Sequence, residues 1–447
     1  MIEGVGRAGG EGAVAWPDRR RFLRLAGAVA TAASAAACGF VPGEQAADEP
    51  DVLTVALWGT EAELAAFRAL ADLFARRHPG ARVALDIAPY ENFFTNIDAR
   101  LQAGRPPDLF RVDYDTFGVY AGAKQLLDLS KLLPPGFGER FTPAMWQAVC
   151  VGRTPFGVPH HTDTSVILYN VEALRAAGVT EVPRTPEEAW TWEQFDQVAV
   201  KLRRSAPAGR YPFVVNWQST GVTRWLTWLF AAGGRFLGPD LRTPAIDAAA
   251  GRAALDFTRG FFQRGLVPPN SSVKATTYAS DTWYAQTTAM TFGGAFLLPD
   301  ANSTLDFAWG ATYAPRHVRA GSDLGGNALV ATAATTKPAL AAAFLDLVTQ
   351  QEPMRQFCTA SSALPTRRDL TAANLRFTAR PELTPVFLGQ AATVQPQDAA
   401  QVASPAMDAI NLVLSDQLEE AFVGGQDTGK TLAAMAEGIA AATARRP

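Results

Sequence analysis

The first part of the chain beyond the N-terminal region alternates strands with helices, and this alternation limits the possible folds more than any other feature. The strands are apolar runs of the kind found in buried parallel sheets, and the helices show apolar residues at helical spacing. The expected strands are 52–58, 82–88 and 108–112, and the expected helices are 61–77 and 90–102. This β-α-β-α-β order predicts a parallel sheet with helices on both of its faces.

Polar and aromatic side chains follow the expected strands. In parallel sheets ligands bind beyond the carboxyl ends of the strands, which lie on one rim. The residues expected at this rim are Trp58, Glu61, Tyr90, Asp113 and Asp115. Each also has a structural explanation, since Trp58 could pack in the core, Glu61 could offset a helix dipole and the aspartates could cap a turn. We interpret the rim as a candidate binding site.

Residues 155–170 in mid-chain change from a polar, proline-containing loop to an apolar run. A chain of 447 residues favours two domains, and this stretch is interpreted as the passage between them. Its polar half contains His160, His161 and Asp163. Adjacent histidines in an extended segment point apart, and no second cluster of metal ligands accompanies them. We therefore expect hydrogen bonds to a ligand, without a metal.

A second αβ body is expected after this passage. Its helices are predicted at 171–177, 191–204, 222–232, 246–264 and 337–350, and its strands at 211–217, 289–292, 307–313 and 327–332, followed by a mostly helical C-terminal region. Trp217, at a strand end, is the preferred aromatic ligand contact, whereas Trp225 and Trp228 lie on one helix face and are interpreted as core. Gly293 and Gly294 would allow close backbone approach after a strand.

The N-terminal region has the features of an export signal. Residues 18–24 resemble the twin-arginine motif, and the uncharged run that follows is shorter than the roughly 20 residues that span a bilayer. Residues 35–38 resemble a lipobox, in which Cys38 would be lipidated; a plain secretory signal is the alternative. We expect residues 1–37 to be a signal peptide and residues 38–51 to include the lipidated cysteine and a polar tether, which places the protein on the outer face of the cytoplasmic membrane.

Charge and cysteine content narrow the function further. The net charge is −3 and the body of the chain has no basic block, which argues against a nucleic-acid partner. Cys150 and Cys358 would meet an oxidising compartment after export. They could form a disulfide or remain as two buried thiols, because spacing does not determine connectivity.

Several short motifs, each present once, follow one another along the chain. They are Phe74 to Gly80 with Val83, Ala103 to Leu109, Phe156 to Pro159 with Leu168 to Asn170, Thr191 to Phe195, Thr288 to Gly293, Pro315 with Gly325-Gly326, and Leu364 to Arg367. With the export signal, this series resembles the family 1 extracellular solute-binding proteins, which are the receptors of carbohydrate-type ABC importers. The resemblance covers nearly all of residues 52–440.

The resemblance implies a type II-like periplasmic-binding-protein fold, with two α/β lobes, each a mainly parallel sheet flanked by helices, joined by crossover hinge strands. Lobe one would comprise 52–163 and 308–362, and lobe two 164–307 and 363–447. A monomer is expected to bind a small carbohydrate in the cleft between the lobes and to deliver it to ABC permease subunits, without a cofactor.

The resemblance also assigns site residues. Asp115 occupies the place of a sugar-binding acid in maltose-binding relatives, Asp163 matches an acid just before the crossover, and Phe296 stands where relatives stack an aromatic ring on sugar. The further candidates are Tyr313, Gly326, Asn327 and Arg367. Arg367 could instead form a salt bridge at the hinge.

The function that the resemblance implies is capture of a sugar or oligosaccharide for import. A polyamine would suit the acidic residues, whereas a glycerol phosphate would require a more basic cleft. Paired acids also occur in glycosidases, but the chain lacks the G-x-S-x-G and H-E-x-x-H motifs. A receptor-type subunit that only signals is a further alternative.

Overall fold

The expected alternation of strands and helices is present. The computed structural model describes residues 51–218 and 221–444, so the predicted signal peptide, Cys38 and the tether up to residue 50 lie outside the described residues. The first five elements are β1 (Val52–Leu57), α2 (Glu61–Arg77), β2 (Arg82–Ile87), α3 (Tyr90–Gln102) and β3 (Leu109–Asp113). Both helices have the predicted bounds.

Helix α2 begins where its capping residues require. The side chain of Thr60 accepts a hydrogen bond from the backbone N–H of Glu63, and the carboxylate of Glu63 accepts one from the N–H of Thr60. This reciprocal arrangement satisfies two N–H groups at the helix start that have no partner within the helix. It also fixes Thr60 and Glu63 directly beyond the end of β1.

Six strands form the larger sheet, in the order β12-β6-β11-β3-β1-β2. The added strands are β6 (Val158–Asp163), β11 (Gly325–Ala331) and β12 (Leu364–Pro365). β1 pairs in parallel with β2 and β3, whereas β11 and β6 pair in antiparallel fashion with their neighbours. The sheet is therefore mixed and not mainly parallel as predicted, because it includes strands that carry the chain towards the smaller sheet and back.

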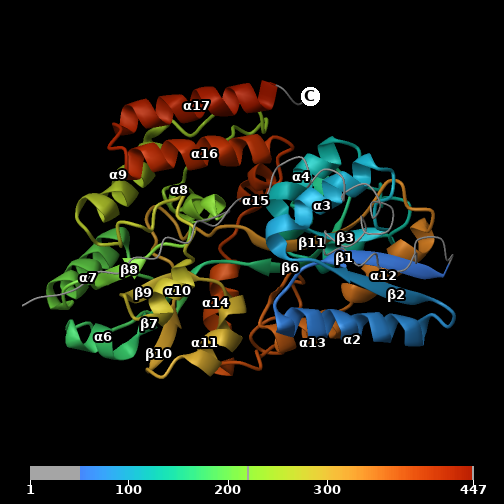
Figure 1. Ribbon diagram of the computed structural model, residues 1–447, viewed down its shortest axis with the longest axis horizontal. Coiled ribbons are helices and arrows are strands. Elements are labelled where there is room, and N and C mark those ends of the chain that lie inside the picture. The colour runs from blue at the N-terminus through green and yellow to red at the C-terminus, as the bar shows by residue number, and fades with distance from the viewer. Residues whose placement is uncertain (1–50, 219–220, 445–447) are drawn as a thin grey trace, which may run out of the picture. The chain divides into compact units, whose positions relative to one another are not determined.

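Helices cover both faces of the larger sheet, as expected for this class (Figure 1). Alternate residues of β1 point to opposite faces, so Leu53 and Val55 join the apolar cluster that contains Phe67 of α2. Ala56 joins the other cluster, with Phe93 of α3. Helices α4 (Tyr114–Gly122) and α13 (Gln351–Ser361) extend these two layers, α4 beside α3 and α13 against α2 (Figure 1).

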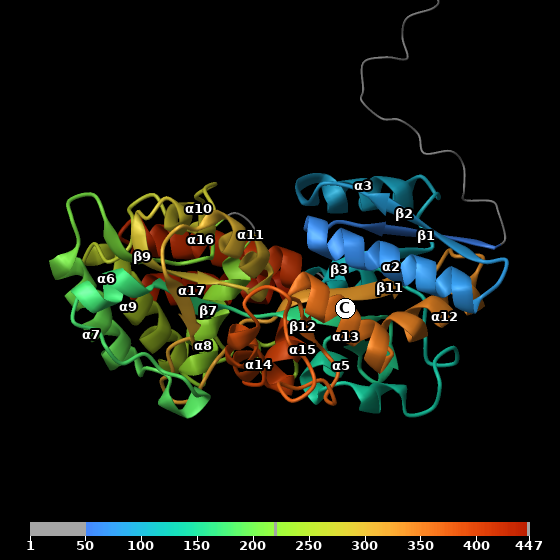
Figure 2. The same cartoon turned by 90° about the horizontal axis from the view of Figure 1, so that it is seen from below.

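Four strands form the smaller sheet, in the order β10-β7-β9-β8. They are β7 (Val166–Asn170), β8 (Tyr211–Val214), β9 (Thr288–Gly293) and β10 (Trp309–Thr312). Only β8 and β9 are parallel, so this sheet also departs from the predicted parallel order. We call the larger sheet with its helices the first lobe, and the smaller sheet with its helices the second lobe (Figure 2).

The chain passes between the two sheets at positions that differ partly from the predicted boundaries. β6 belongs to the larger sheet and β7 to the smaller one, so the first passage lies at Thr164 and Ser165. β10 pairs with β7, which places residues 309–312 in the second lobe and not in the first. β12 is still part of the larger sheet, beyond the predicted boundary at residue 363. An apolar strand is compatible with either sheet, so its pattern does not identify its partner.

Helices complete both lobes and form most of the C-terminal region. In the order of the chain they are α5 (Pro143–Gln147), α6 (Val171–Ala176), α7 (Trp192–Ser205), η4 (Val222–Trp225), α8 (Leu226–Ala231), α9 (Ala249–Gln263), α10 (Ala279–Tyr284), α11 (Leu298–Thr304), α12 (Pro338–Val348), α14 (Thr384–Ala391), α15 (Pro396–Val402), α16 (Met407–Phe422) and α17 (Thr428–Ala444). α16 contacts α4 of the first lobe and α9 and η4 of the second. None of the helices within the described ranges is long and apolar enough to cross a membrane.

Candidate functional site

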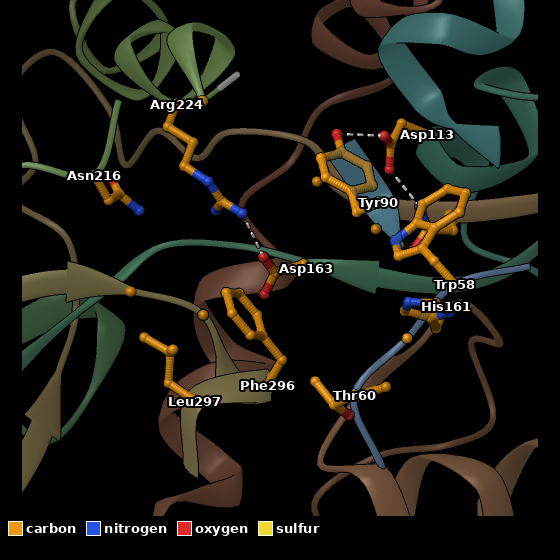
Figure 3. A pocket seen from close by; sticks show the side chains of 18 of the residues that line it. Trp58, Thr60, Tyr90, Asp113, His161, Asp163, Asn216, Arg224, Phe296 and Leu297 are labelled. Carbon is orange, nitrogen blue, oxygen red and sulfur yellow. Dashed lines mark hydrogen bonds and ion pairs between the residues drawn. The ribbon is translucent and has the colours of Figure 1, made fainter. Parts of the chain in front are cut away.

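A cavity of about 720 Å³ is lined by residues of both lobes. Its size is in the range of small-molecule sites. Arg224 and Asn216 reach it from the second lobe, and Trp58, Tyr90 and Asp113 from the first (Figure 3). The structure brings together eleven of the predicted site residues at this cavity, namely Trp58, Tyr90, Asp113, Asp115, His161, Asp163, Gly293, Gly294, Phe296, Gly326 and Asn327.

Five predicted site residues do not line the cavity. Glu61 is exposed at the first turn of α2, where it takes the helix-dipole position that was its alternative. Tyr313 is buried and packs against Gly389. Arg367 forms an ion pair with Asp369 at 2.6 Å, which corresponds to its alternative as a structural salt bridge.

The other two, His160 and Trp217, are core residues. His160 is 1% exposed and stacks on Phe67, while its neighbour His161 lines the cavity. Both histidines were predicted to face a ligand, but successive side chains of a strand point to opposite faces, so only His161 of this pair lines the cavity. Trp217 is 1% exposed and stacks on Phe422, so it cannot serve as a platform for a ligand in this arrangement.

Arg111 of β3 organises the polar wall of the first lobe. Its Nη2 atom lies 2.6 Å from Oε1 of Glu63 and 3.0 Å from Nε2 of His161, and it donates to Oδ1 of Asn327. The guanidinium also lies over the ring of Trp58, 4.8 Å from its centroid. Burial opposes the charge of Glu63, but Arg111 and the capping hydrogen bonds lower the pKa of Glu63 below its usual value.

Asp113 ends β3 and Asp115 lies in the first turn of α4, and both receive only neutral donors. The hydroxyl of Tyr90 donates to Oδ2 of Asp113 at 2.9 Å, and Nδ2 of Asn327 donates to Oδ1. Asn411 of α16 donates to Oδ2 of Asp115 at 3.1 Å. Burial, together with the nearby charge of Asp115, raises the pKa of Asp113 to about 7, and burial also raises the pKa of Asp115.

Arg224 of η4 lines the cavity and contacts both segments of the chain that pass between the lobes. Its Nη2 atom lies 2.9 Å from Oδ2 of Asp163, at the end of β6 (Figure 3). Its Nη1 atom lies 3.0 Å from Oδ2 of Asp323 on the returning passage and donates to Oγ of Ser165 at 3.2 Å. Burial alone would lower the pKa of Arg224, but the two carboxylates raise it above its usual range.

Two glycines permit close packing around the passage, as expected for Gly294. A Cβ atom at Gly294 would lie 2.1 Å from Oδ1 of Asp163. Gly326 has φ of +88°, and a Cβ there would lie 2.4 Å from the Cα of Thr162. A larger residue at either position would displace the end of β6.

Sequence reasoning missed several cavity residues, chiefly Arg111, Arg224 and Glu63. Arg111 lies inside a run interpreted as a buried strand, and Arg224 stands beside tryptophans interpreted as core. A signal was available in both cases, because an arginine in an apolar segment is rarely buried without a partner. Glu63 could have been found from the T-x-x-E pattern that begins at Thr60, which is a capping signature.

The structure also bears on metals and on the disulfide. Among the residues that the structure describes, no group of three histidine, cysteine, aspartate or glutamate side chains is placed to hold a metal ion. Cys150 and Cys358 are both free, so no disulfide joins them; Cys358 is a buried thiol, whereas Cys150 is only partly buried.

Two α/β lobes joined by crossing strands around a polar and aromatic cavity define the class of two-lobed binding proteins. Residues 58–355 match the model of the family described as bacterial extracellular solute-binding protein. This match covers more than half of the chain, and the protein belongs to that family. The resemblance inferred from the motifs is thereby confirmed, and the family is one of extracellular binding proteins.

Two curated relatives match part of the chain. An uncharacterised lipoprotein encoded in the oleD 5′ region of Streptomyces antibioticus is 31% identical over 159 residues, which is 35% of this chain and 34% of the relative. The arabinooligosaccharide-binding protein of Bacillus subtilis is 24% identical over 134 residues, or 29% of this chain and 30% of the relative. The chain thus spans about a third of the length of each.

Solved structures share the fold over most of the chain. The GacH receptor of Streptomyces glaucescens, solved unliganded and with acarbose, is 18% identical with a TM-score of 0.73, covering 89% of this chain and 100% of its own. The cyclic α-maltosyl-1,6-maltose binding protein of Arthrobacter globiformis is 17% identical with a TM-score of 0.74 over the same shares. UgpB of Mycobacterium tuberculosis, in complex with glycerophosphocholine, is 21% identical with a TM-score of 0.72, again over those shares.

Proposed function

We propose that this protein is the solute-binding component of an ABC importer and that it captures a sugar or oligosaccharide in the cavity between its lobes. The observation that carries the proposal is the composition of the cavity wall. Trp58, Tyr90 and Phe296 line the same cavity as the carboxylates of Asp113 and Asp115, with Tyr90 and Trp58 beside Asp113 and Phe296 nearer to Asp163 (Figure 3). Sugars present C–H patches and hydroxyls, and charge-assisted hydrogen bonds to hydroxyls are about twice as strong as neutral ones.

Closure of the two lobes on the ligand would create the form that the permease subunits recognise. A ligand that contacts both lobes binds the closed form better and shifts the population towards it. A shift from 1:99 to 99:1 requires about 5.5 kcal/mol of differential binding. The names of two of the reported relatives, the arabinooligosaccharide-binding protein and the cyclic α-maltosyl-1,6-maltose binding protein, support a saccharide ligand.

A phosphate-bearing solute is less well supported, although one structural neighbour was solved with glycerophosphocholine. Arg111 and Arg224 are the guanidiniums that line the cavity, and both already contact carboxylates. A phosphate would have to compete with these carboxylates for each arginine, which is unfavourable for a buried anion.

The direct test is a thermal-shift screen of mono-, di- and trisaccharides, polyamines and glycerol phosphates, followed by calorimetry on the hits. A ligand at 100 times its Kd stabilises the native state by about 2.7 kcal/mol. Trp58→Ala should weaken saccharide binding at least tenfold, whereas Trp217→Phe, a core change outside the cavity, should leave affinity unchanged. Turnover of labelled oligosaccharides would instead show an enzyme, and a screen in which only phosphorylated solutes bind would refute the sugar proposal.

We also propose that Cys38 is lipidated and holds the protein on the outer face of the cytoplasmic membrane. The lipobox-like residues 35–38 and the lipoprotein name of one relative support this. A Cys38→Ala variant expressed in the native host should move from the membrane fraction to the soluble extracytoplasmic fraction. Equal distribution of variant and wild type between these fractions would contradict lipid anchoring.

A further inference from the structure

The charges that line the cavity do not balance. Its carboxylates are Glu63, Asp113, Asp115, Asp163 and Asp323, and its guanidiniums are Arg111 and Arg224. Arg111 forms an ion pair with Glu63, and Arg224 with both Asp163 and Asp323. Burial and the charge of Arg111 keep the pKa of His161 well below its usual value, so this side chain is neutral. Asp113 and Asp115 are thus the two carboxylates of the wall that form no ion pair with any described residue.

The surroundings of Asp113 and Asp115 are suited to an added positive charge. Their donors are neutral groups: the hydroxyl of Tyr90 and the amide of Asn327 for Asp113, and the amide of Asn411 and the hydroxyl of Thr116 for Asp115. Tyr90 lies against Trp58, with ring centroids 5.2 Å apart, and Figure 3 shows both rings beside Asp113 at the cavity. Aromatic faces attract cations within about 6 Å, so carboxylate and ring would act on the same group.

A second, independent observation comes from the opposite wall. Gln218 lines the cavity and is 4% exposed, yet its Oε1 atom receives no hydrogen bond from the described residues, while its Nε2 atom donates to the carbonyl of Ser271. A buried acceptor without a donor is costly, so a donor on the ligand would satisfy it. Nε of Arg111 is an unpartnered donor on the first wall, but the charge of that guanidinium is balanced by Glu63.

We propose that the ligand carries a protonated amine, which binds at Asp113 and Asp115 beside the rings of Tyr90 and Trp58. The chemical class is an aminated saccharide or, if the ligand is not a sugar, a polyamine. This inference rests on the proposed function only in taking the cavity as the ligand site.

Proton linkage gives the proposal a distinct signature. Burial and Asp115 raise the pKa of Asp113 to about 7, so a bound ammonium would expel a proton from this pair near neutral pH. The groups that face the pair from neighbouring elements are Tyr90, Arg111, Asn327, Asn411 and, across the cavity, Arg224. Amide side chains do not ionise, and a guanidinium stays charged in proteins. Affinity for an amine should therefore rise with pH in this window, whereas affinity for a neutral sugar should not.

The test compares matched probes by calorimetry on the full chain. The 6-amino-6-deoxy derivatives of maltose and cellobiose differ from their parents by one amine, and spermidine serves as the polyamine. We expect at least tenfold tighter binding of an aminated probe than of its parent at pH 7.5, and an approximately tenfold gain for that probe between pH 6 and 8. Asp115→Asn should weaken binding of the aminated probe more than binding of its neutral parent, so that most of the preference for the amine is lost.

Each outcome decides a separate question. Equal or weaker binding of the aminated sugars, with spermidine inactive, overturns the inference and leaves saccharide capture standing if the neutral parents bind. Binding of spermidine alone supports the amine site as one for a polyamine, and the wider saccharide screen then decides the proposed function. Binding of none of these probes overturns the amine site, and the wider saccharide screen then decides the proposed function independently.

Discussion

Replacement of Asp323 by asparagine tests whether the polar contacts at the passage between the lobes hold the structure together. The side chain of Asp323 is 1% exposed. Oδ1 accepts hydrogen bonds from the N–H of Ser165 at 2.9 Å and from Oγ1 of Thr227 at 3.2 Å, and Oδ2 lies 3.0 Å from Nη1 of Arg224. Asparagine has the same shape but presents an NH₂ group on one side. In either orientation this group faces a donor that the carboxylate accepted.

The expected cost follows from these contacts. Loss of one partner from a buried ion pair destabilises by about 3–5 kcal/mol. Arg224 retains Asp163, so we expect a loss near the lower end, about 3 kcal/mol. The matched control is Asp196→Asn, whose exposed pair with Arg264 should be worth at most about 1 kcal/mol.

Urea denaturation of the ligand-free protein, followed by tryptophan fluorescence and by circular dichroism, measures both losses. The midpoint should shift for Asp323→Asn with an unchanged slope. If Asp323→Asn costs no more than Asp196→Asn, the contacts at the passage do not stabilise the fold, and the reasoning fails.

Three further predictions concern other parts of the molecule. Burial raises the pKa of Asp113 from 3.8 to about 7, so the native state keeps a proton that the unfolded chain loses. The free energy of unfolding should therefore fall by at most about 4 kcal/mol between pH 4 and 7. Denaturation of Asp113→Asn should show a weaker dependence of this free energy on pH, and an unchanged dependence would contradict the prediction. Gly294→Ala would place a Cβ 2.1 Å from Oδ1 of Asp163. Calorimetry should then show weaker binding, and thermal melts should show about 1–3 kcal/mol of destabilisation. Wild-type values in both assays would contradict this prediction. Cys150 and Cys358 form no disulfide, and burial raises the pKa of Cys150 to about 12 and the pKa of Cys358 further. Mass spectrometry should therefore find both cysteines alkylated by iodoacetamide at pH 8 only after unfolding. Rapid labelling of the native protein would contradict this.

The parts of the fold that the sequence predicted well are those determined by local interactions. α2 and α3 have strong apolar periodicity, and a capping box marks the start of α2. Pairing between strands is not local, which is why β10 was assigned to the wrong lobe and why both sheets were expected to be mainly parallel. Register depends on partners that the periodic pattern of one strand does not identify.

The candidate site shows the same division. Asp113 and Asp115 were found because they follow an expected strand and topology places strand ends on one rim, whereas Asn327 was named through the resemblance to the family. Arg111 and Arg224 were missed because their partners are distant in sequence: Glu63 lies 48 positions from Arg111, and Asp323 lies 99 positions from Arg224. Side chains that owe their role to such contacts become recognisable only in the folded structure.

The contacts of Arg224 limit how modular this receptor can be. Because residues of both lobes line the cavity, exchanging one lobe for that of a relative would change the ligand site. Here Arg224 comes from the second lobe, whereas its partner Asp163 ends a strand of the first and packs against Gly294 of the second. A chimaera that exchanges one lobe would therefore need to carry Arg224, Asp163, Asp323 and Gly294 as a unit, or it would leave a buried charge without its partner at the point where the chain bends.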